Sequence, residues 1–243
     1  MDYKYPTPQL LFKAICNAIR SKTGNSDEIP HQNIPDELDS IITEEECEIA
    51  VQELSNIIYG SEVKVLDSKY ILNIAGYKFY GSGLTTVNLP KCISIGYAAF
   101  SNCTNLITVN LPECTNIEGD AFENCTSLTT IVLPKCTFIN HYAFKNCTSL
   151  TTVNLPECTN IGTCAFENCT NLTTIILSNN QIVTLKDIRA FNNSSIANGT
   201  GYIYVPDNLV DSYKTATNWS TYANQIKPIN ELPSNLKEEY GYE

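Results

Sequence analysis

The sequence contains no long apolar run and few basic residues, and each absence excludes a class of protein. No stretch of about 18 consecutive apolar residues occurs, so no transmembrane helix is expected. The 15 Lys and Arg residues are outnumbered by 26 Asp and Glu residues, which gives a net charge of −11 without any basic cluster. Nucleic acid and anionic membrane surfaces are therefore not expected as partners. The first 22 residues also lack the basic region and uninterrupted apolar stretch of a signal peptide.

Residues that carry catalysis or hold metals are equally scarce. The only histidines are His31 and His141, and neither has a nucleophile and an acid at a recognisable spacing. No glycine-rich phosphate loop is present. The 11 cysteines recur with a repeat and do not form the paired short spacings of zinc sites; the closest two, Cys164 and Cys169, are separated by four residues. We expect no enzymatic activity, no cofactor and no metal site.

What the sequence does contain is an internal repeat. Four consecutive 22-residue units nearly superimpose, with the pattern L-x-x-[VI]-x-L-P-x-C-x-x-I-x-x-x-A-F-x-N-C-x-x. A unit this short cannot bury its own apolar face, so the units must stack into a solenoid. A degenerate unit precedes them at 61–83, and a fifth begins at Leu172 with a three-residue insertion before Ala190-Phe191. The four regular units are 84–105, 106–127, 128–149 and 150–171.

Four columns of the repeat predict its interior and its turns. Two columns of cysteine are interpreted as buried, reduced small hydrophobic residues, because a disulfide framework is usually irregularly spaced. A column of phenylalanine predicts an aromatic spine under the convex side. A column of asparagine lies in N-C-T sequences, which are formal glycosylation sequons but are better explained as turn-stabilising residues. The columns are Cys92, Cys114, Cys136 and Cys158; Cys103, Cys125, Cys147 and Cys169; Phe100, Phe122, Phe144 and Phe166; and Asn102, Asn124, Asn146 and Asn168.

The first half of each unit matches the leucine-rich repeat signature, and the whole unit resembles one bacterial family. The L-P-x-C-x-x-I and A-F-x-N-C elements, over about residues 70–206, resemble the BspA-like leucine-rich repeats. We therefore expect an α+β repeat protein: a leucine-rich repeat solenoid of 22-residue units with one strand per repeat, a helical N-terminal segment and a short C-terminal cap. The resemblance implies a cell-surface or secreted protein used in attachment, with no catalytic motif.

The N-terminal part, residues 1–60, is expected to form a separate helical module. Apolar spacing and capping residues predict helices over about 7–24, 35–42 and 44–58. The segment from LLFKAICNAIRSKTG to PDELDSI, residues 10–41, resembles a short helical module of phage and prophage tail-associated proteins. This module either caps the solenoid or attaches it to a partner.

The C-terminal part, residues 207–243, is expected to be a cap and tail that follow the solenoid of residues 61–206. The cap begins with a predicted short helix over 207–217, with Asp207 as its N-cap. Packing on the last coil is predicted for Trp219, Tyr222 and Ile226. The acidic, polar tail over 231–243 is expected to be frayed.

The outward-facing strand positions of the solenoid are the candidate binding surface. They are uncharged and rich in threonine, so one interpretation is a flat platform for a neutral ligand, either a glycan or a polar protein surface. The alternative is that threonine is present because it favours strands and hydrogen-bonds across them. A second candidate is the irregular loop 192–201, which breaks the repeat. The candidate binding residues are Thr86, Thr108, Thr130, Thr152, Thr174, Asn88, Asn110 and Asn154.

These observations favour non-enzymatic recognition over catalysis, with two contexts left open. In the first, the chain is a recognition or adhesion protein at a bacterial cell surface, where it binds a protein or glycan ligand on another cell or host surface. In the second, it is a phage or prophage virion protein that recognises the host. The protein is expected at the cell surface, or secreted, if a signal peptide was removed, and otherwise in a virion. A column of alternating charge, Lys91, Glu113, Lys135 and Glu157, is interpreted as a device that keeps neighbouring coils in register.

Overall fold

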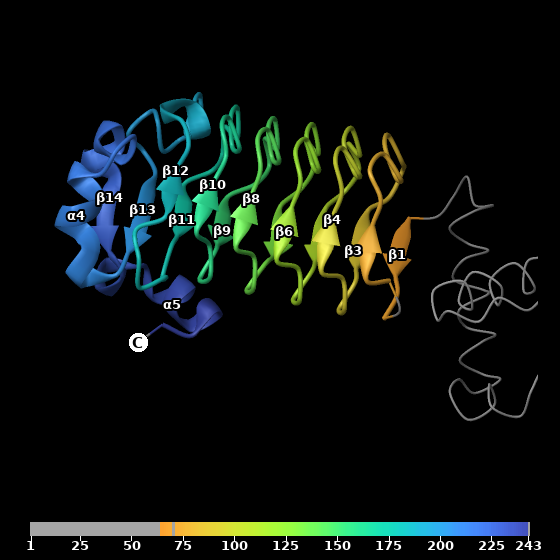
Figure 1. The fold of residues 1–243 in the computed structure, drawn as a ribbon, viewed down its shortest axis with the longest axis horizontal. Helices are drawn as coiled ribbons and strands as arrows, with labels where there is room; N and C mark the ends of the chain where they lie inside the picture. The colour runs from red at the N-terminus through yellow and green to blue at the C-terminus, as the bar shows by residue number, and fades with distance from the viewer. Residues whose placement is uncertain (1–63, 70, 243) are drawn as a thin grey trace, which may run out of the picture. The chain divides into compact units, whose positions relative to one another are not determined.

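The computed structural model describes residues 64–69 and 71–242, and the expected helical module of residues 1–60 lies outside them. Within the described residues, successive coils stack side by side (Figure 1). All paired strands are parallel, as they must be when each coil repeats the path of the one before. The predicted solenoid is therefore confirmed.

The first strand of each coil lies at the L-x-x-[VI]-x-L part of the repeat. Alternation directs the central residue, such as Val109, into the core and its two neighbours outward. Each residue pairs with its repeat equivalent, so that Thr86 lies beside Thr108. The sheet orders are β1-β3-β5-β7 and β14-β13-β11-β9. The strands are β1 (Val65–Asp67), β3 (Thr86–Asn88), β5 (Thr108–Asn110), β7 (Thr130–Val132), β9 (Thr152–Asn154), β11 (Thr174–Ile176), β13 (Tyr202–Val205) and β14 (Ile226–Pro228).

Each coil from 73 to 185 also contributes a second strand of two residues, which differs from the one strand per repeat that we expected. The isoleucine of C-x-x-I points inward here, and the following amide bonds to the coil before; for example, the Glu118 N–H donates to the Ile95 carbonyl at 2.9 Å. The sheet order is β12-β10-β8-β6-β4-β2. These strands are β2 (Asn73–Ile74), β4 (Ser94–Ile95), β6 (Asn116–Ile117), β8 (Phe138–Ile139), β10 (Asn160–Ile161) and β12 (Thr184–Leu185).

The described residues of the degenerate unit, 64–69 and 71–83, form the first described coil. Leu66 lies beside Val87 in β3, and the coil enters the second sheet through β2. Phe79 stacks on Phe100 with ring centroids 5.3 Å apart. This segment therefore keeps the path of the repeat although its sequence has lost most of the pattern.

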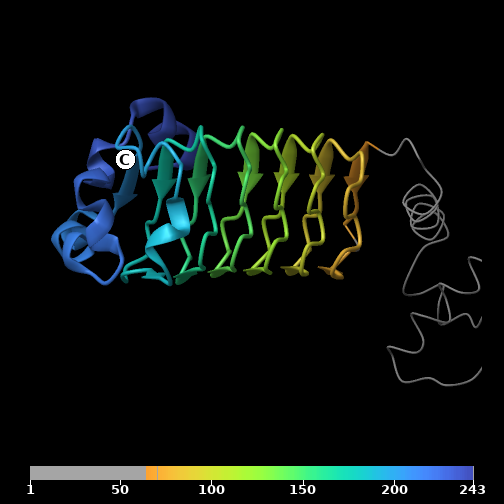
Figure 2. The same ribbon diagram turned by 90° about the horizontal axis from the view of Figure 1, so that it is seen from above.

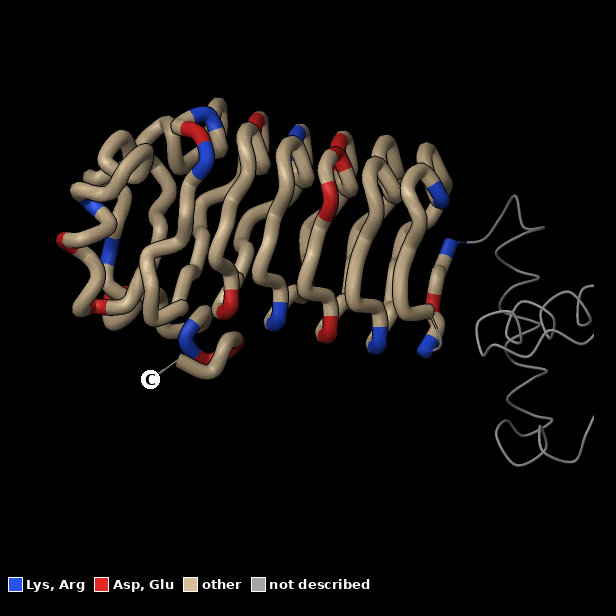
Figure 3. Tube along the Cα trace, viewed as in Figure 1, with Lys and Arg blue, Asp and Glu red and all other residues tan. Residues whose placement is uncertain are grey.

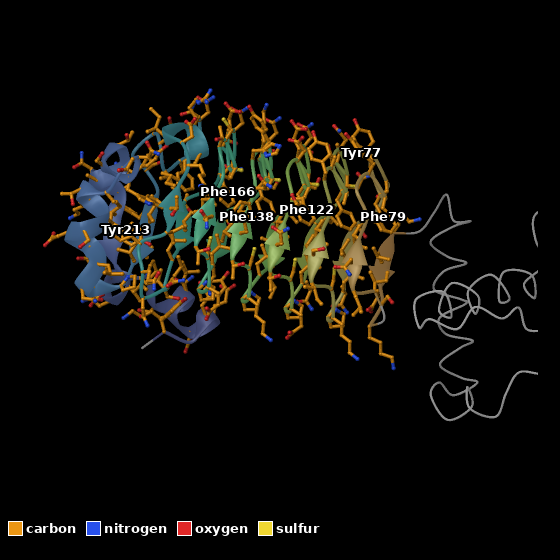
Figure 4. The ribbon with its side chains drawn as sticks, in the orientation of Figure 1. Tyr77, Phe79, Phe122, Phe138, Phe166 and Tyr213 are labelled. Carbon is orange, nitrogen blue, oxygen red and sulfur yellow. The ribbon has the colours of Figure 1, made fainter. Side chains whose placement is uncertain are left out.

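The phenylalanine column forms the predicted aromatic spine. Neighbouring rings from Phe100 to Phe166 stack almost in parallel, with centroids 5.3 Å apart, and all four rings are fully buried. Figure 4 shows Phe122 and Phe166 inside the stack, and Phe191 of the fifth unit continues the spine at 5.7 Å. The three inserted residues lie before Phe191 and do not displace it from the spine.

Both cysteine columns are buried, and the cysteines of the described residues are free thiols. In one column each sulfur donates to a phenylalanine carbonyl one coil earlier, as Cys125 does to Phe100 at 3.2 Å. Burial raises the pKa of the Cys114, Cys158 and Cys169 thiols to about 12. The columns are therefore neutral packing elements, as predicted.

The asparagine column stabilises the turns, also as predicted. Each of these residues has a positive φ, which asparagine tolerates better than most residues. From Asn124 onward each side-chain amide also donates to the amide oxygen one coil before it, and Asn193 of the fifth unit continues this hydrogen-bond ladder. The Nδ2 to Oδ1 distances are 3.0 Å for Asn124 to Asn102, 2.6 Å for Asn146 to Asn124, 2.7 Å for Asn168 to Asn146 and 2.8 Å for Asn193 to Asn168.

Helical segments gather at the C-terminal end of the stack (Figure 2). They close the last coil with aromatic side chains whose polar atoms bond to its backbone. The Trp219 indole N–H donates to the Val183 carbonyl at 2.7 Å, and the Tyr222 hydroxyl donates to the Ile188 carbonyl. The predicted packing of this segment is confirmed. The helices are η1 (Ile188–Phe191), η2 (Asp207–Leu209), α4 (Val210–Thr215), η3 (Trp219–Gln225), η4 (Ile229–Glu231) and α5 (Ser234–Tyr240).

Two expectations for the C-terminal part were wrong. Asp207 is not a helix cap, because its carboxylate accepts from the side-chain amide of Asn230 at 2.7 Å and so ties η2 to η4. The tail, which is described as far as residue 242, is not frayed, because α5 forms within it. Leu232 is buried with Ile176 and Tyr204, and Leu236, Tyr240 and Tyr242 pack against this cluster. Leu232, Leu236 and Tyr240 recur at every fourth residue, which places them on one side of the tail. The charged residues between them made the tail look polar throughout in the sequence.

Candidate binding surface

The outward-facing side chains of β3, β5, β7 and β9 form an accessible, uncharged surface, which we call the strand surface. Thr130 is exposed, and its equivalents in the other three coils are half-buried. Figure 3 shows the Lys and Arg, Asp and Glu positions mainly along the edges of the coils, and their signs alternate along much of the lower edge. The predicted residues that lie on this surface are Thr86, Thr108, Thr130, Thr152, Asn88, Asn110 and Asn154.

Two threonine rows on this surface differ in their hydrogen bonds. In the row just before each strand, the hydroxyls of Thr85, Thr129 and Thr173 donate to main-chain carbonyls one coil earlier, at 2.8 to 3.3 Å. In the row of Thr86, Thr108, Thr130 and Thr152, the hydroxyls make no hydrogen bond within the described residues. Hydrogen bonding between coils therefore explains why threonine occurs in the first row, but it does not explain the threonines of the second row.

The asparagines of the surface are partly used by the fold. Asn110 donates to the Asn88 side chain at 2.8 Å, and Asn88 donates to the Asp67 carboxylate at 2.9 Å. Val132 interrupts this ladder in the next coil and leaves an apolar side chain 39% exposed. Asn154 instead accepts a hydrogen bond from the Tyr242 hydroxyl at 2.9 Å.

The strand surface ends at β9, since the C-terminal tail covers the next coil. Thr174, which we predicted to be a binding residue, is only 8% exposed, and Ile176 is fully buried. Tyr242 extends from the end of α5 and shares hydrogen bonds with Ser178 and Asn154, each at 2.9 Å. Thr174 is thus excluded from the accessible surface. The apolar tail residues Leu232, Leu236 and Tyr240 could have indicated from the sequence that the tail packs on this coil.

The charged edges carry few close ion pairs. In the column of alternating sign, Lys135 bonds to both carboxylate oxygens of Glu113, at 2.7 and 2.8 Å, and both side chains are about half exposed. On another edge, Lys145 lies 3.9 Å from Glu123 and 3.6 Å from Glu167. Ion pairs at the surface contribute about 0–1 kcal/mol each, so they adjust the alignment of coils rather than hold them together.

Reactive groups do not converge on the strand surface. The thiols are buried with a raised pKa, and His141 is exposed elsewhere, with its Nδ1 at 2.8 Å from the Asn140 side-chain oxygen. Among residues 64–69 and 71–242, no group of three His, Cys, Asp or Glu residues is placed to hold a metal ion. In the same part of the chain, no helix has the length and apolar character needed to cross a bilayer. What the surface offers is rigid hydroxyl, amide and methyl groups.

The irregular loop 192–201 is more ordered than its sequence suggests. The buried Ser194 hydroxyl donates to the Phe191 carbonyl at 2.6 Å, and Ser195 donates to the Thr170 carbonyl at 2.7 Å. Ile196 is buried, whereas 197–200 are exposed. The loop is therefore anchored to the coil before it, and its longest exposed stretch is the tip at 197–200.

Three solved structures resemble this chain in part. A leucine rich repeat protein of T. pallidum is 24% identical, with a TM-score of 0.47 over 63% of this chain and 82% of its own. A leucine rich cell surface protein of Faecalibacterium prausnitzii is 24% identical, with a TM-score of 0.41 over 64% and 42%. A leucine-rich repeat protein of Bacteroides ovatus is 22% identical, with a TM-score of 0.45 over 70% and 47%, so the chain spans less than half of the last two.

The repeat itself assigns the chain to a family. None of the curated proteins matches this sequence. Six copies of the BspA type leucine rich repeat region match residues 72–198, which is more than half of the chain. The matched span begins within the degenerate coil, includes the four regular units and extends into the fifth unit. This protein therefore belongs to the BspA type leucine rich repeat family.

Proposed function

We propose that this protein is a non-enzymatic recognition or adhesion protein that binds a protein or glycan through its strand surface at a bacterial cell surface. Leucine-rich repeat proteins bind other proteins, which makes interaction the general expectation. The observation that carries the assignment to this surface is the threonine row of Thr86, Thr108, Thr130 and Thr152. Its hydroxyls are partly accessible and have no partner within the described residues, so stacking of the coils does not use them.

Two further features support the choice of this surface. The absence of charge from β3 to β9 suits a ligand that is recognised by hydrogen bonds and methyl contacts, and such binding depends little on salt. The exposed side chains of Ile107 and Val132 add apolar contact area where most equivalent positions carry Thr or Asn. A rigid surface of this kind loses little conformational entropy when it binds.

The test uses the Thr130→Lys/Thr152→Lys double variant, because two charges disrupt a neutral footprint and remain solvated. Fluorescent beads coated with the full chain are measured for adhesion to cultured epithelial cells and to intact bacteria. We expect the double variant to lose at least about tenfold in adhesion, and wild-type adhesion to persist at 0.5 M NaCl, roughly where screening has removed ionic contacts.

A matched control carries the same two charges on the turns. Thr104 and Thr170 are exposed and make no side-chain hydrogen bond within residues 64–69 and 71–242, so Thr104→Lys/Thr170→Lys should adhere like the wild type. Shortening the loop tip at 197–200 tests the second candidate surface. Wild-type adhesion of the Thr130→Lys/Thr152→Lys variant would exclude the strand surface.

The alternative is a virion protein of a phage or prophage that recognises its host. Its support is the resemblance of residues 10–41 to the helical module of tail-associated proteins. The recognition chemistry is the same in both contexts, and the difference is whether the protein is carried by the bacterial cell surface or by a phage tail. Immunogold labelling after prophage induction distinguishes them, because label on tails supports the alternative and label on the cell envelope supports adhesion.

A further inference from the structure

Exposed aromatic side chains gather on one edge of the first coils, at the turn after the second strand. Tyr77, Tyr80 and Tyr97 are 60%, 55% and 42% exposed, and Figure 4 labels Tyr77 at this edge, apart from Phe79. Their rings form a chain with His141 and Tyr142, which we call the aromatic ridge. The centroid distances are 6.1 Å for Tyr80–Tyr77, 5.4 Å for Tyr77–Tyr97, 6.3 Å for Tyr97–His141 and 5.8 Å for His141–Tyr142.

A glycine makes the ridge continuous across a coil that carries no aromatic residue at this edge. Gly119 lies between Tyr97 and His141 in the same column, and a Cβ atom there would lie 2.5 Å from Nε2 of His141. The imidazole therefore occupies the space above Gly119 and reaches toward Tyr97. Asn140 holds His141 in place, because its side-chain oxygen accepts from the backbone N–H and lies 2.8 Å from Nδ1.

Polar neighbours hold the rings in place without covering them. A hydrogen bond between the Tyr97 hydroxyl and the Asp120 carboxylate, followed by their charge interaction, raises the pKa of Tyr97 to about 12. The Lys145 ammonium lies 4.8 Å from the centre of the Tyr142 ring. Tyr97, His141 and Tyr142 thus have polar partners within the protein, which lowers the entropic cost of fixing these side chains when a ligand binds.

The fold does not require these side chains. Tyr77 and Tyr142 have φ values of 59° and 56°, in the left-handed region that bulky residues avoid. The equivalent positions carry Ala98, Asp120 and Cys164, so smaller residues satisfy this turn. Interior packing is supplied by the phenylalanine spine. Tyr77 is both exposed and held in this strained conformation, which points to a use outside the protein.

We propose that the aromatic ridge is a second binding site, separate from the strand surface, and that it binds neutral carbohydrate chains. The faces of tyrosine rings suit the C–H faces of pyranose sugars, since both are flat and weakly polar. Lys78, next to Tyr77, and Asp120, next to Tyr97, supply a donor and an acceptor for sugar hydroxyls. Charges of both signs flank the rings, so the site matches a neutral polyhydroxyl ligand better than an ionic one.

The experiment measures the migration of the full chain in native gels that contain laminarin, xylan, galactomannan or hydroxyethyl cellulose, against a gel without polysaccharide. We expect at least one of these neutral polysaccharides to retard the protein. The Tyr77→Asn/Tyr97→Thr variant should bind about tenfold or more weakly, because truncating central aromatic contacts typically has this effect. Asn tolerates the positive φ of residue 77, and Thr163 occupies the equivalent of residue 97, so both substitutions suit the fold.

Two further variants isolate the contribution of the ridge. Tyr97→Phe keeps the ring and the stack, so it should retain most of the binding. Thr130→Lys/Thr152→Lys alters only the strand surface and should be retarded like the wild type. Failure of the strand-surface proposal and failure of the ridge proposal can therefore be told apart. The proposal is overturned if none of the four polysaccharides retards the protein, or if the folded Tyr77→Asn/Tyr97→Thr variant binds normally.

Discussion

The regular coils at 84–171 and the closing segment at 172–242 bury their interiors in two different ways. The regular coils use identical residues one above another: stacked phenylalanines, buried thiols and an asparagine ladder. The closing segment contains no cysteine and uses Tyr213, Trp219 and Tyr222, each bonded to a backbone group of the fifth unit. Repeated columns allow coil after coil to be added, whereas the aromatic side chains of the closing segment end the stack.

This difference shows what a solenoid needs in order to stop. Every regular coil offers the next one the same apolar surface and the same unpaired backbone groups, so the last coil would expose both. Large aromatic side chains with a polar atom cover the apolar surface and satisfy the backbone at once. Substitutions and changes of pH can compare the two regions, and the larger effects are expected in the regular coils.

The largest expected effect is an alkaline loss of stability that comes from the regular coils. Burial raises the pKa of the folded thiols, from 9.0 to about 12 for Cys114, Cys158 and Cys169, so ionisation favours the unfolded chain. This stabilisation is complete below pH 9 and is lost as the pH rises from 9 toward 12. Each such thiol loses on the order of 1 kcal/mol per pH unit above 9.

Urea denaturation at pH 8, 9 and 10 measures this loss. The Cys114→Ala/Cys158→Ala variant is the matched comparison. It removes two titrating thiols, so its free energy of unfolding should fall less between pH 8 and pH 10 than that of the wild type. An unchanged urea midpoint between pH 8 and pH 10 would contradict the interpretation of the columns as buried, neutral thiols.

Removing one ring from the spine should have the next largest effect. Phe144 is fully buried between Phe122 and Phe166, so Phe144→Ala leaves a cavity that its stacked neighbours cannot fill. We expect a loss of about 3–5 kcal/mol in the free energy of unfolding, measured by urea denaturation. Phe144→Leu, which retains most of the volume, should lose less. A loss below about 1 kcal/mol would mean that the coils do not depend on the spine.

The asparagine ladder should contribute less than the spine. Asn146→Ala removes two ladder hydrogen bonds and places alanine at a φ of 61°, so we expect a loss of about 2–3 kcal/mol. Asn146→Gly removes the same bonds but relieves the backbone, so it should lose about 1–2 kcal/mol. Equal losses in the two variants would show that the left-handed conformation has no cost here.

The smallest effect is expected in the closing segment. Tyr213→Phe deletes the hydroxyl that accepts the buried Val183 N–H at 2.9 Å, while it keeps the ring. One unpaired buried donor should lower the free energy of unfolding by about 1–2 kcal/mol. Tyr202→Phe is the matched control, since the Tyr202 hydroxyl makes no hydrogen bond within the described part of the chain. A loss no larger than that of the control would mean that water satisfies Val183.

Sequence reasoning was most reliable where a residue recurs. Burial of the cysteine and phenylalanine columns and the turn role of the asparagines follow from period and residue type, because equivalent positions in a stack have equivalent surroundings. The same reasoning was wrong where the repeat ends. Asp207 resembles a helix cap, but its carboxylate bonds to Asn230, which lies 23 residues away in the sequence. No local pattern reports a partner at that distance.

The candidate surface shows the same limit. The sequence identified the outward rows, yet it assigned Thr174 the same exposure as Thr86, because both occupy the same position in their units. Only the folded C-terminal part, in which Tyr202 lies beside Thr174 and Tyr242 bonds to Asn154, separates a covered coil from an open one.

The aromatic ridge was missed for a related reason. Tyr77 belongs to a different column of the repeat from Tyr97 and His141, so no single column reports an aromatic cluster. The rings meet only through the geometry of the turns and the space that Gly119 leaves open.

The sequence by itself determined the solenoid, its inward columns and the uncharged character of its strands. These follow from a short period and from the need of each unit to bury one apolar face against its neighbours. The tertiary structure alone decided which outward residues stay accessible, which threonine hydroxyls are used by the fold and which aromatic rings meet. Those outcomes depend on contacts between residues far apart in the chain, and a repeating pattern carries no information about such contacts where the repetition stops.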